Sequence, residues 1–484
     1  MAPTLIIFGA SGDLTSRKLI PALYVLCRKK RLPPGTTIVG FSRTAFSHDA
    51  WRRQLAESTA QFVGPDFDRS AWDELASRIF YFPGDAERHE DYVALERFLE
   101  QTEAAPPTTR IYYLSMAPRF YESAVAHLGA AGMADETRGP RRIVVEKPFG
   151  VDLASARQLN RKLHDVFAES QIYRIDHYLG KETVQNLLVL RFANTIFEPV
   201  WNRNYVDHVE ITAAEALAVG HRAGYYDAAG VLRDMFQGHL LQLLALAAME
   251  PPVRYEAEPV RDEKVKVLRA VRPLRPEDVA DATVRGQYRG YRQEPNVRPD
   301  SQTATFAAVR LYVDNWRWQG VPFYLRSGKA MECATTQVVI QFREPPSMLF
   351  EGGPRSPRDS NRLLVQIQPA EGVQVHFYTK VPDGGMRLRM TDLNFRFREK
   401  FTGPMPEAYQ RLLLDVIHGD ASLFARSDEV ETAWSIVDPI QSTWDAASRP
   451  ALLTYEPGMW GPPETALWME RQGRSWFDIC PVLH

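Results

Sequence analysis

The segment between residues 4 and 26 constrains the fold most, because it combines a strand, a glycine turn and a helix. Thr4–Phe8 is mostly β-branched or aromatic, which is typical of a buried parallel strand. Gly9 and Gly12 follow, and leucines then recur at helical spacing. This order predicts a Rossmann unit, in which a pyrophosphate lies at a helix N-terminus. The spacing departs from G-x-G-x-x-G, so an ordinary strand–helix turn is the alternative.

Three further strand candidates extend this pattern: 37–41, 110–114 and 142–146. The first ends beside Arg43, where NAD enzymes carry an acidic residue for the ribose hydroxyls. An arginine suits the 2′-phosphate of NADP instead, although a surface arginine is the simpler alternative. The last strand leads into Lys147, which a parallel sheet would direct into its ligand crevice.

A second informative segment, Arg174–Glu182, holds two cations, an imidazole, a phenol and two carboxylates, Asp176 and Glu182, within nine residues. Such a cluster is costly to bury unless its charges meet partners. A helix starting near Lys181 would add backbone N–H donors and the positive end of a helix dipole. We therefore expect an anion-binding segment here; a solvated loop with ordinary ion pairs is the alternative.

The chain of 484 residues is too long for one typical core, and its pattern changes after residue 200. Strand-like runs then predominate over helices, which predicts an α+β domain on a large, mainly antiparallel sheet. The predicted strands are Val206–Thr212, Thr305–Tyr312, Phe323–Arg326, Gln337–Phe342, Arg362–Ile367, Val373–Tyr378 and Met386–Met390.

Composition narrows the possible functions. A formal net charge of −2 argues against a general nucleic-acid binder. The most apolar late run, Leu240–Met249, is too short to span a membrane and predicts a buried helix. No signal peptide is visible. Cys27, Cys333 and Cys480 are few and far apart, so we expect a reducing compartment, no disulfide framework and no metal site. A cytoplasmic protein is predicted.

Five motifs, spread from residue 9 to residue 329, resemble those of the glucose-6-phosphate dehydrogenase family. They are Gly9–Leu14, Glu146–Gly150, Arg174–Glu182, Arg233–Gln242 and Val321–Lys329. The resemblance implies an NADP-binding Rossmann-like α/β domain over residues 1–175. It also implies an α+β substrate-binding and dimerisation domain over residues 176–484.

The same resemblance implies the reaction. D-glucose 6-phosphate would be oxidised to 6-phospho-D-glucono-1,5-lactone with hydride transfer to NADP⁺, which opens the oxidative pentose phosphate pathway. The enzyme would be a homodimer or homotetramer. His239 would be the general base, since histidine titrates near working pH, and Asp176 would orient it. The alternatives are a core histidine at 239 and a local Asp176–Arg174 ion pair.

The family's binding residues carry over by position. The sugar and its phosphate would contact His177, Tyr178, Lys181, Glu215, Asp234, Lys329 and Lys147. The coenzyme would contact Gly9, Ala10, Ser11, Gly12, Asp13, Leu14, Lys18, Arg43, Tyr113 and Lys147. One departure is Ala334, where the family often has a second cation. Two other functions compete: a sugar oxidoreductase acting on an unphosphorylated or different sugar, and a regulator that binds NADP without turnover.

Overall fold

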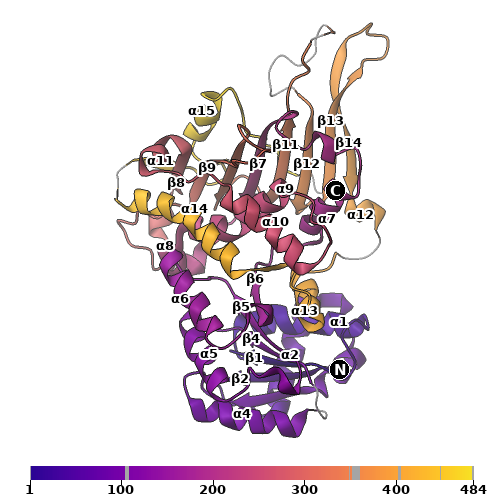
Figure 1. Cartoon of the computed structure of the whole chain (residues 1–484), viewed down its shortest axis with the longest axis vertical. Coiled ribbons are helices and arrows are strands. Elements are labelled where there is room, and N and C mark those ends of the chain that lie inside the picture. The colour runs from indigo at the N-terminus through magenta and orange to yellow at the C-terminus, as the bar shows by residue number, and fades with distance from the viewer. Residues whose placement is uncertain are drawn as a thin grey trace. The chain divides into compact units, whose positions relative to one another are not determined.

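The computed structural model describes residues 2–103, 108–347, 349–350, 360–401, 405–446 and 449–481 (Figure 1). They form two compact units. The first comprises Met1–Lys181, Arg254–Arg261 and Pro406–Glu431. The second comprises Glu182–Val253, Asp262–Met405 and Thr432–His484.

The first unit is built on a seven-stranded sheet with the order β15-β6-β5-β4-β1-β2-β3. Every neighbouring pair is parallel except β15 and β6. The strands are β1 (Thr4–Phe8), β2 (Thr37–Ser42), β3 (Ile79–Pro83), β4 (Arg110–Leu114), β5 (Arg141–Glu146), β6 (Ile172–Ile175) and β15 (Phe424–Ala425). All residues of β1 and β4 are buried, as expected of central parallel strands covered on both faces. The predicted α/β Rossmann-type domain is confirmed.

Among the described residues of this unit, seven complete α-helices accompany the sheet. They are α1 (Ile20–Arg28), α2 (His48–Val63), α3 (Arg69–Ala76), α4 (His89–Thr102), α5 (Tyr121–Ala130), α6 (Leu153–His164) and α13 (Ala408–His418). Helix α6 begins at a capping box in which Asp152 and Ser155 satisfy each other's backbone N–H groups. Helix α13 comes from the far end of the chain and packs against α1.

The second unit contains a nine-stranded sheet with the order β14-β13-β12-β11-β7-β10-β9-β8-β16. Its strands are β7 (Val206–Ala214), β8 (Thr283–Tyr288), β9 (Phe306–Tyr312), β10 (Pro322–Gly328), β11 (Thr335–Phe342), β12 (Arg362–Gln368), β13 (Gly372–Lys380), β14 (Leu388–Arg396) and β16 (Leu452–Tyr455). Only the pairs β7–β10 and β8–β16 are parallel, so the predicted large, mainly antiparallel sheet is confirmed.

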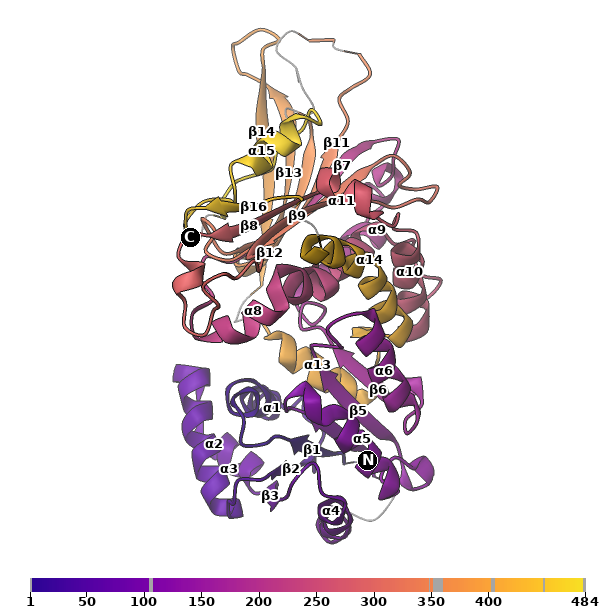
Figure 2. The same cartoon turned by 90° about the vertical axis from the view of Figure 1, so that its left-hand side faces the viewer.

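Helices α8 (Ala223–Val231) and α9 (Leu241–Ala248) lie on one side of this sheet (Figure 2). Every residue of α9 is buried, which confirms the helix predicted for the apolar run. The remaining α-helices of the described residues are α7 (Glu182–Phe192), α10 (Ala257–Arg269), α11 (Pro276–Ala282), α12 (Phe397–Lys400), α14 (Ser427–Ala446) and α15 (Glu464–Glu470). Within the described residues, no helix is long and apolar enough to cross a membrane.

Two expectations are corrected. The strand predicted at Met386–Met390 is β14, which starts at Leu388 and runs to Arg396 because it pairs with β13 along that whole length. The expected lack of disulfides is wrong: Cys333 and Cys480 are bonded across a sequence separation of 147. Phe477 packs against Val339 of β11, and this contact brings the C-terminal segment to the loop that precedes β11.

Candidate active site

The glycine turn of the first unit follows β1 directly. Gly9 has a φ of +80°, and a Cβ at this position would collide with the carbonyl oxygen of Ser115. The Gly9 N–H donates to Phe41 O on β2 at 2.9 Å, and the Gly12 N–H donates back to Gly9 O at 2.9 Å. A π-helical segment, η1 (Thr15–Leu19), then leads into α1. Glycine at residue 9 is therefore required for a backbone that a phosphate group could approach closely.

Two of the three predicted coenzyme cations, Arg43 and Lys18, have different surroundings. Arg43 directly follows β2, the strand in which the Phe41 carbonyl accepts the hydrogen bond from the Gly9 N–H. The Lys18 ammonium lies 3.2 Å from a carboxylate oxygen of Glu407, in an exposed ion pair. Glu407 is 389 residues away in the sequence, so no pattern near Lys18 could have indicated this partner.

A hydrogen-bonded group of one carboxylate and two phenols lies at the ends of β4 and β5. The Tyr113 hydroxyl donates to Glu146 Oε1 at 2.5 Å, and the Tyr409 hydroxyl donates to the same oxygen at 3.1 Å. Burial is the main reason that the pKa of Glu146 rises to about 7. Lys147 follows immediately after β5. Tyr113 was predicted as a coenzyme contact, whereas Glu146 and Tyr409 were not predicted.

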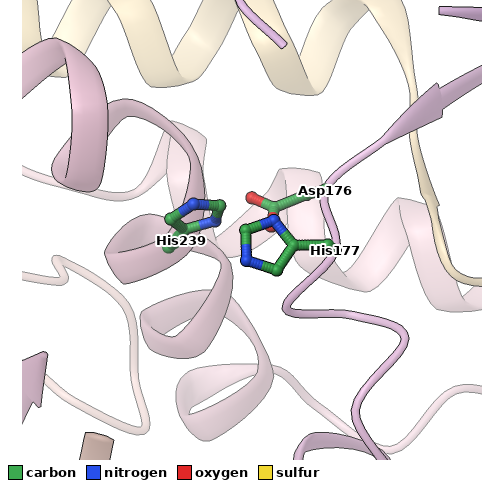
Figure 3. Close-up of side chains that lie close together, drawn as sticks. All are labelled: Asp176, His177 and His239. Carbon is green, nitrogen blue, oxygen red and sulfur yellow. The ribbon is translucent and has the colours of Figure 1, made fainter. Parts of the chain in front are cut away.

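Beyond β6 the chain makes tight turns that fix the charged segment (Figure 3). Asp176 is 2% exposed and its Oδ1 accepts the Tyr178 backbone N–H at 3.0 Å. The backbone N–H of Leu179 donates to Asp176 O at 3.0 Å, and that of Lys181 donates to Tyr178 O at 3.1 Å. Helix α7 then begins at Glu182, as predicted.

Within this segment the cations divide into two roles. Arg174 is buried, and both of its terminal nitrogens donate hydrogen bonds to the Glu169 carboxylate, at 2.7 and 3.2 Å. This ion pair stabilises β6. Lys181 instead places its ammonium 3.7 Å from the centre of the Tyr178 ring, and this ring makes a T-shaped contact with the ring of His177. The structure therefore brings the side chains of His177, Tyr178 and Lys181 together, whereas Arg174 pairs with Glu169.

In the second unit, a charge cluster forms because β7 and β10 run parallel. Ala214 and Gly328 are register partners, so the residues that follow them, Glu215 and Lys329, leave the same edge of the sheet. The Lys329 ammonium forms an ion pair with Glu215 and lies 3.4 Å from Asp234 Oδ2. Three of the predicted sugar-binding residues thus meet in one place.

His239 and Asp234 both belong to η8 (Leu232–Leu240), a π-helical segment between α8 and α9. Figure 3 shows His239. Segments of this kind often mark functional sites. His239 is 6% exposed, and the chain enters η8 after a break at Gly230, which has a φ of +67°. Ala334, the position at which the family often has a second cation, is exposed and follows Cys333, which forms the disulfide.

The chain was compared with known proteins. Residues 6–186 match the glucose-6-phosphate dehydrogenase NAD-binding domain, and residues 188–477 match the C-terminal domain of that family. Glucose-6-phosphate 1-dehydrogenase of Rhizobium meliloti is 44% identical, over 98% of this chain and 97% of the relative. The Mycolicibacterium smegmatis enzyme of the same name is 44% identical, over 97% and 96%.

Solved structures give the same result. A glucose-6-phosphate dehydrogenase in complex with its substrate glucose 6-phosphate superposes with a TM-score of 0.91 at 34% identity, with 98% of each chain covered. Glucose-6-phosphate 1-dehydrogenase from Mycobacterium avium superposes with a TM-score of 0.86 at 36% identity, with both chains covered completely.

Proposed function

This chain belongs to the glucose-6-phosphate dehydrogenase family, and from that premise we propose that it oxidises D-glucose 6-phosphate to 6-phospho-D-glucono-1,5-lactone with NADP⁺. The observation that carries the proposal is the cluster at the end of the parallel strands β7 and β10. One ammonium and two carboxylates meet there, in Lys329, Glu215 and Asp234. Carboxylates accept hydrogen bonds, and a sugar offers several hydroxyl donors to them.

The glycine turn fits a dinucleotide. The space that a Cβ would fill at Gly9 is closed by Ser115, so the backbone stays bare where a pyrophosphate would approach. Gly9, Ala10, Ser11, Gly12, Asp13 and Leu14 would line this approach, with Tyr113 and Lys147 at the neighbouring strand ends. When bound, the nicotinamide supplies the acceptor for the hydride. Arg43, at the end of β2, would pair with the 2′-phosphate and so favour NADP over NAD.

His239 would take the proton from the sugar's anomeric hydroxyl, because an imidazole titrates near working pH. Asp176 would hold the tautomer of that imidazole and stabilise the imidazolium that forms. A buried carboxylate suits this role, since an ionic contact is strong where water is excluded.

The substrate's phosphate would be bound by His177, Tyr178 and Lys181. The N–H and O–H groups of the first two donate directed hydrogen bonds, and Lys181 contributes a point charge. The contact with the Tyr178 ring already restricts the Lys181 side chain, so less conformational entropy is lost when the phosphate binds. Glu215, Asp234 and Lys329 would hold the sugar hydroxyls, and Lys147 would lie next to both ligands.

We further propose a homodimeric or homotetrameric enzyme of the cytoplasm that opens the oxidative pentose phosphate pathway. Sugar phosphates and dinucleotides carry multiple charges and do not cross bilayers unaided. An enzyme that uses them is therefore expected in the compartment that contains them. The division into an NADP-binding part over residues 1–175 and a substrate-binding and dimerisation part over residues 176–484 belongs to the same proposal.

The proposal is tested by following the absorbance of reduced nicotinamide with glucose 6-phosphate or glucose, each with NADP or NAD. We expect the highest kcat/KM with glucose 6-phosphate and NADP. Equal rates with free glucose would favour an oxidoreductase for unphosphorylated sugars. Tight NADP binding without turnover of either sugar would favour a regulator.

A further inference from the structure

Tyr226, on α8, differs from the other buried tyrosines around it. The hydroxyls of Tyr288, Tyr291 and Tyr455 donate to Glu294 (2.8 Å), Asp227 (3.1 Å) and Lys329 O (2.6 Å), respectively. Tyr226 belongs to the same core cluster and is 2% exposed. Among the described residues, its hydroxyl has no hydrogen-bond partner.

A buried donor without a partner carries the full cost of its desolvation, so its presence requires an explanation. Packing does not supply one, because phenylalanine would fill the same space without that cost. The surroundings of the Tyr226 ring supply the explanation. Lys329 places its ammonium 5.2 Å from the centre of the Tyr226 ring, and the same ammonium contacts Glu215 and Asp234.

The two carboxylates also act on the phenol. Burial is the main cause that raises the pKa of Tyr226 well above its ordinary value, and the charges of Asp234 and Glu215 raise it further. The phenol therefore keeps its proton at neutral pH and stays a donor beside two acceptors. The three ionic groups of the cluster sum to one negative charge, since a single ammonium serves two carboxylates.

We propose that Tyr226 is a positioning residue for this cluster: its ring holds the Lys329 ammonium, and its hydroxyl donates to Glu215 or Asp234 once a sugar hydroxyl engages Lys329. This additional hydrogen bond keeps the carboxylates of Glu215 and Asp234 oriented toward the substrate while the sugar also contacts the Lys329 ammonium. This inference rests on the proposed function, in which the cluster binds the sugar.

The test is Tyr226→Phe, which removes only the hydroxyl. We expect KM for glucose 6-phosphate to rise about tenfold to hundredfold, the range for one hydrogen bond to a charged acceptor, with KM for NADP unchanged. The thermal midpoint should stay equal or increase, because the change removes an unsatisfied buried group. Tyr225→Phe, at the adjacent and 49% exposed tyrosine, is the matched control and should change neither quantity. An unchanged KM in Tyr226→Phe, whatever the midpoint, would overturn the inference.

A double-mutant cycle with Lys329→Met tests whether Tyr226 acts through Lys329. We expect the loss in the double variant to be smaller than the product of the two single losses, since both act on one cluster. Multiplicative losses would refute the positioning role. If Lys329→Met itself leaves KM for glucose 6-phosphate unchanged, the sugar binds elsewhere and the proposed function of the cluster fails. If only Lys329→Met raises KM, the inference about Tyr226 fails alone.

Discussion

Replacing Glu146 by glutamine should make the stability of this protein less sensitive to pH. Burial raises the pKa of this carboxyl from 4.5 to about 7 in the folded protein. A raised pKa means that the folded state keeps a proton which the unfolded state releases between these two values. The wild type therefore has its full stability below the lower value and loses part of it as pH rises to about 7. At 1.36 kcal/mol for each pH unit, this loss is about 3 kcal/mol.

Glutamine keeps an oxygen that can accept from Tyr113 and Tyr409 but cannot ionise. The free energy of unfolding of Glu146→Gln, minus that of the wild type, should therefore increase by about 2 kcal/mol between about pH 5.5 and about pH 8.5. Urea unfolding followed by tryptophan fluorescence at both pH values measures this difference. Glu57→Gln, at an exposed position of α2, is the matched control. A difference that stays constant with pH would refute the raised pKa and the enclosed network behind it.

Three further predictions concern single residues. Lys181→Thr should raise KM for glucose 6-phosphate, because a phosphate contact exists in ground and transition states alike. The ratio of kcat/KM for glucose 6-phosphate to that for glucose should therefore fall, and an unchanged ratio in steady-state kinetics would place the phosphate elsewhere. Arg43→Ala should weaken NADP binding by about 1.5–3 kcal/mol in a fluorescence titration and leave NAD binding nearly unchanged, and equal losses for both coenzymes would contradict a role at the 2′-phosphate. Cys333→Ser should lower the free energy of unfolding by about 2–5 kcal/mol, since the disulfide closes a long loop, whereas Cys27→Ser should not. Equal stability of the Cys333 variant and the wild type under oxidising conditions would argue against that bond.

The sequence contains enough information for many strands of the two sheets, because these strands are apolar runs of the right length. It did not indicate β3, β6, β8 or β16. β1 and β4 are buried throughout, and such runs are recognisable without any tertiary contact. It contains too little for β15, whose two residues have no period of their own and are ordered only by pairing with β6. Helix α13 has a clear helical pattern, but nothing in that pattern says that it packs against α1.

The site shows the same division. The motifs contain Asp234 and Lys329, and the family resemblance added Glu215 by position alone. Parallel pairing of β7 and β10 explains why Glu215 and Lys329 meet. The alternative considered from the sequence pairs Arg174 with Asp176, two residues away, whereas in the structure Arg174 pairs with Glu169, five residues away. Tyr409 reaches Glu146 across 263 residues. Contacts of this range depend on how elements pack, which local residue patterns do not encode.

The central claim is that His239 is the base of the reaction, and His239→Asn tests it most directly. The variant and the wild type would be compared by single-turnover formation of reduced nicotinamide and by equilibrium binding of glucose 6-phosphate. The predicted result is a fall in the chemical rate of about 10²–10⁴-fold with nearly unchanged substrate affinity, because asparagine can donate a hydrogen bond but cannot take the proton. A chemical rate close to that of the wild type would show that His239 is a core histidine and would contradict the mechanism.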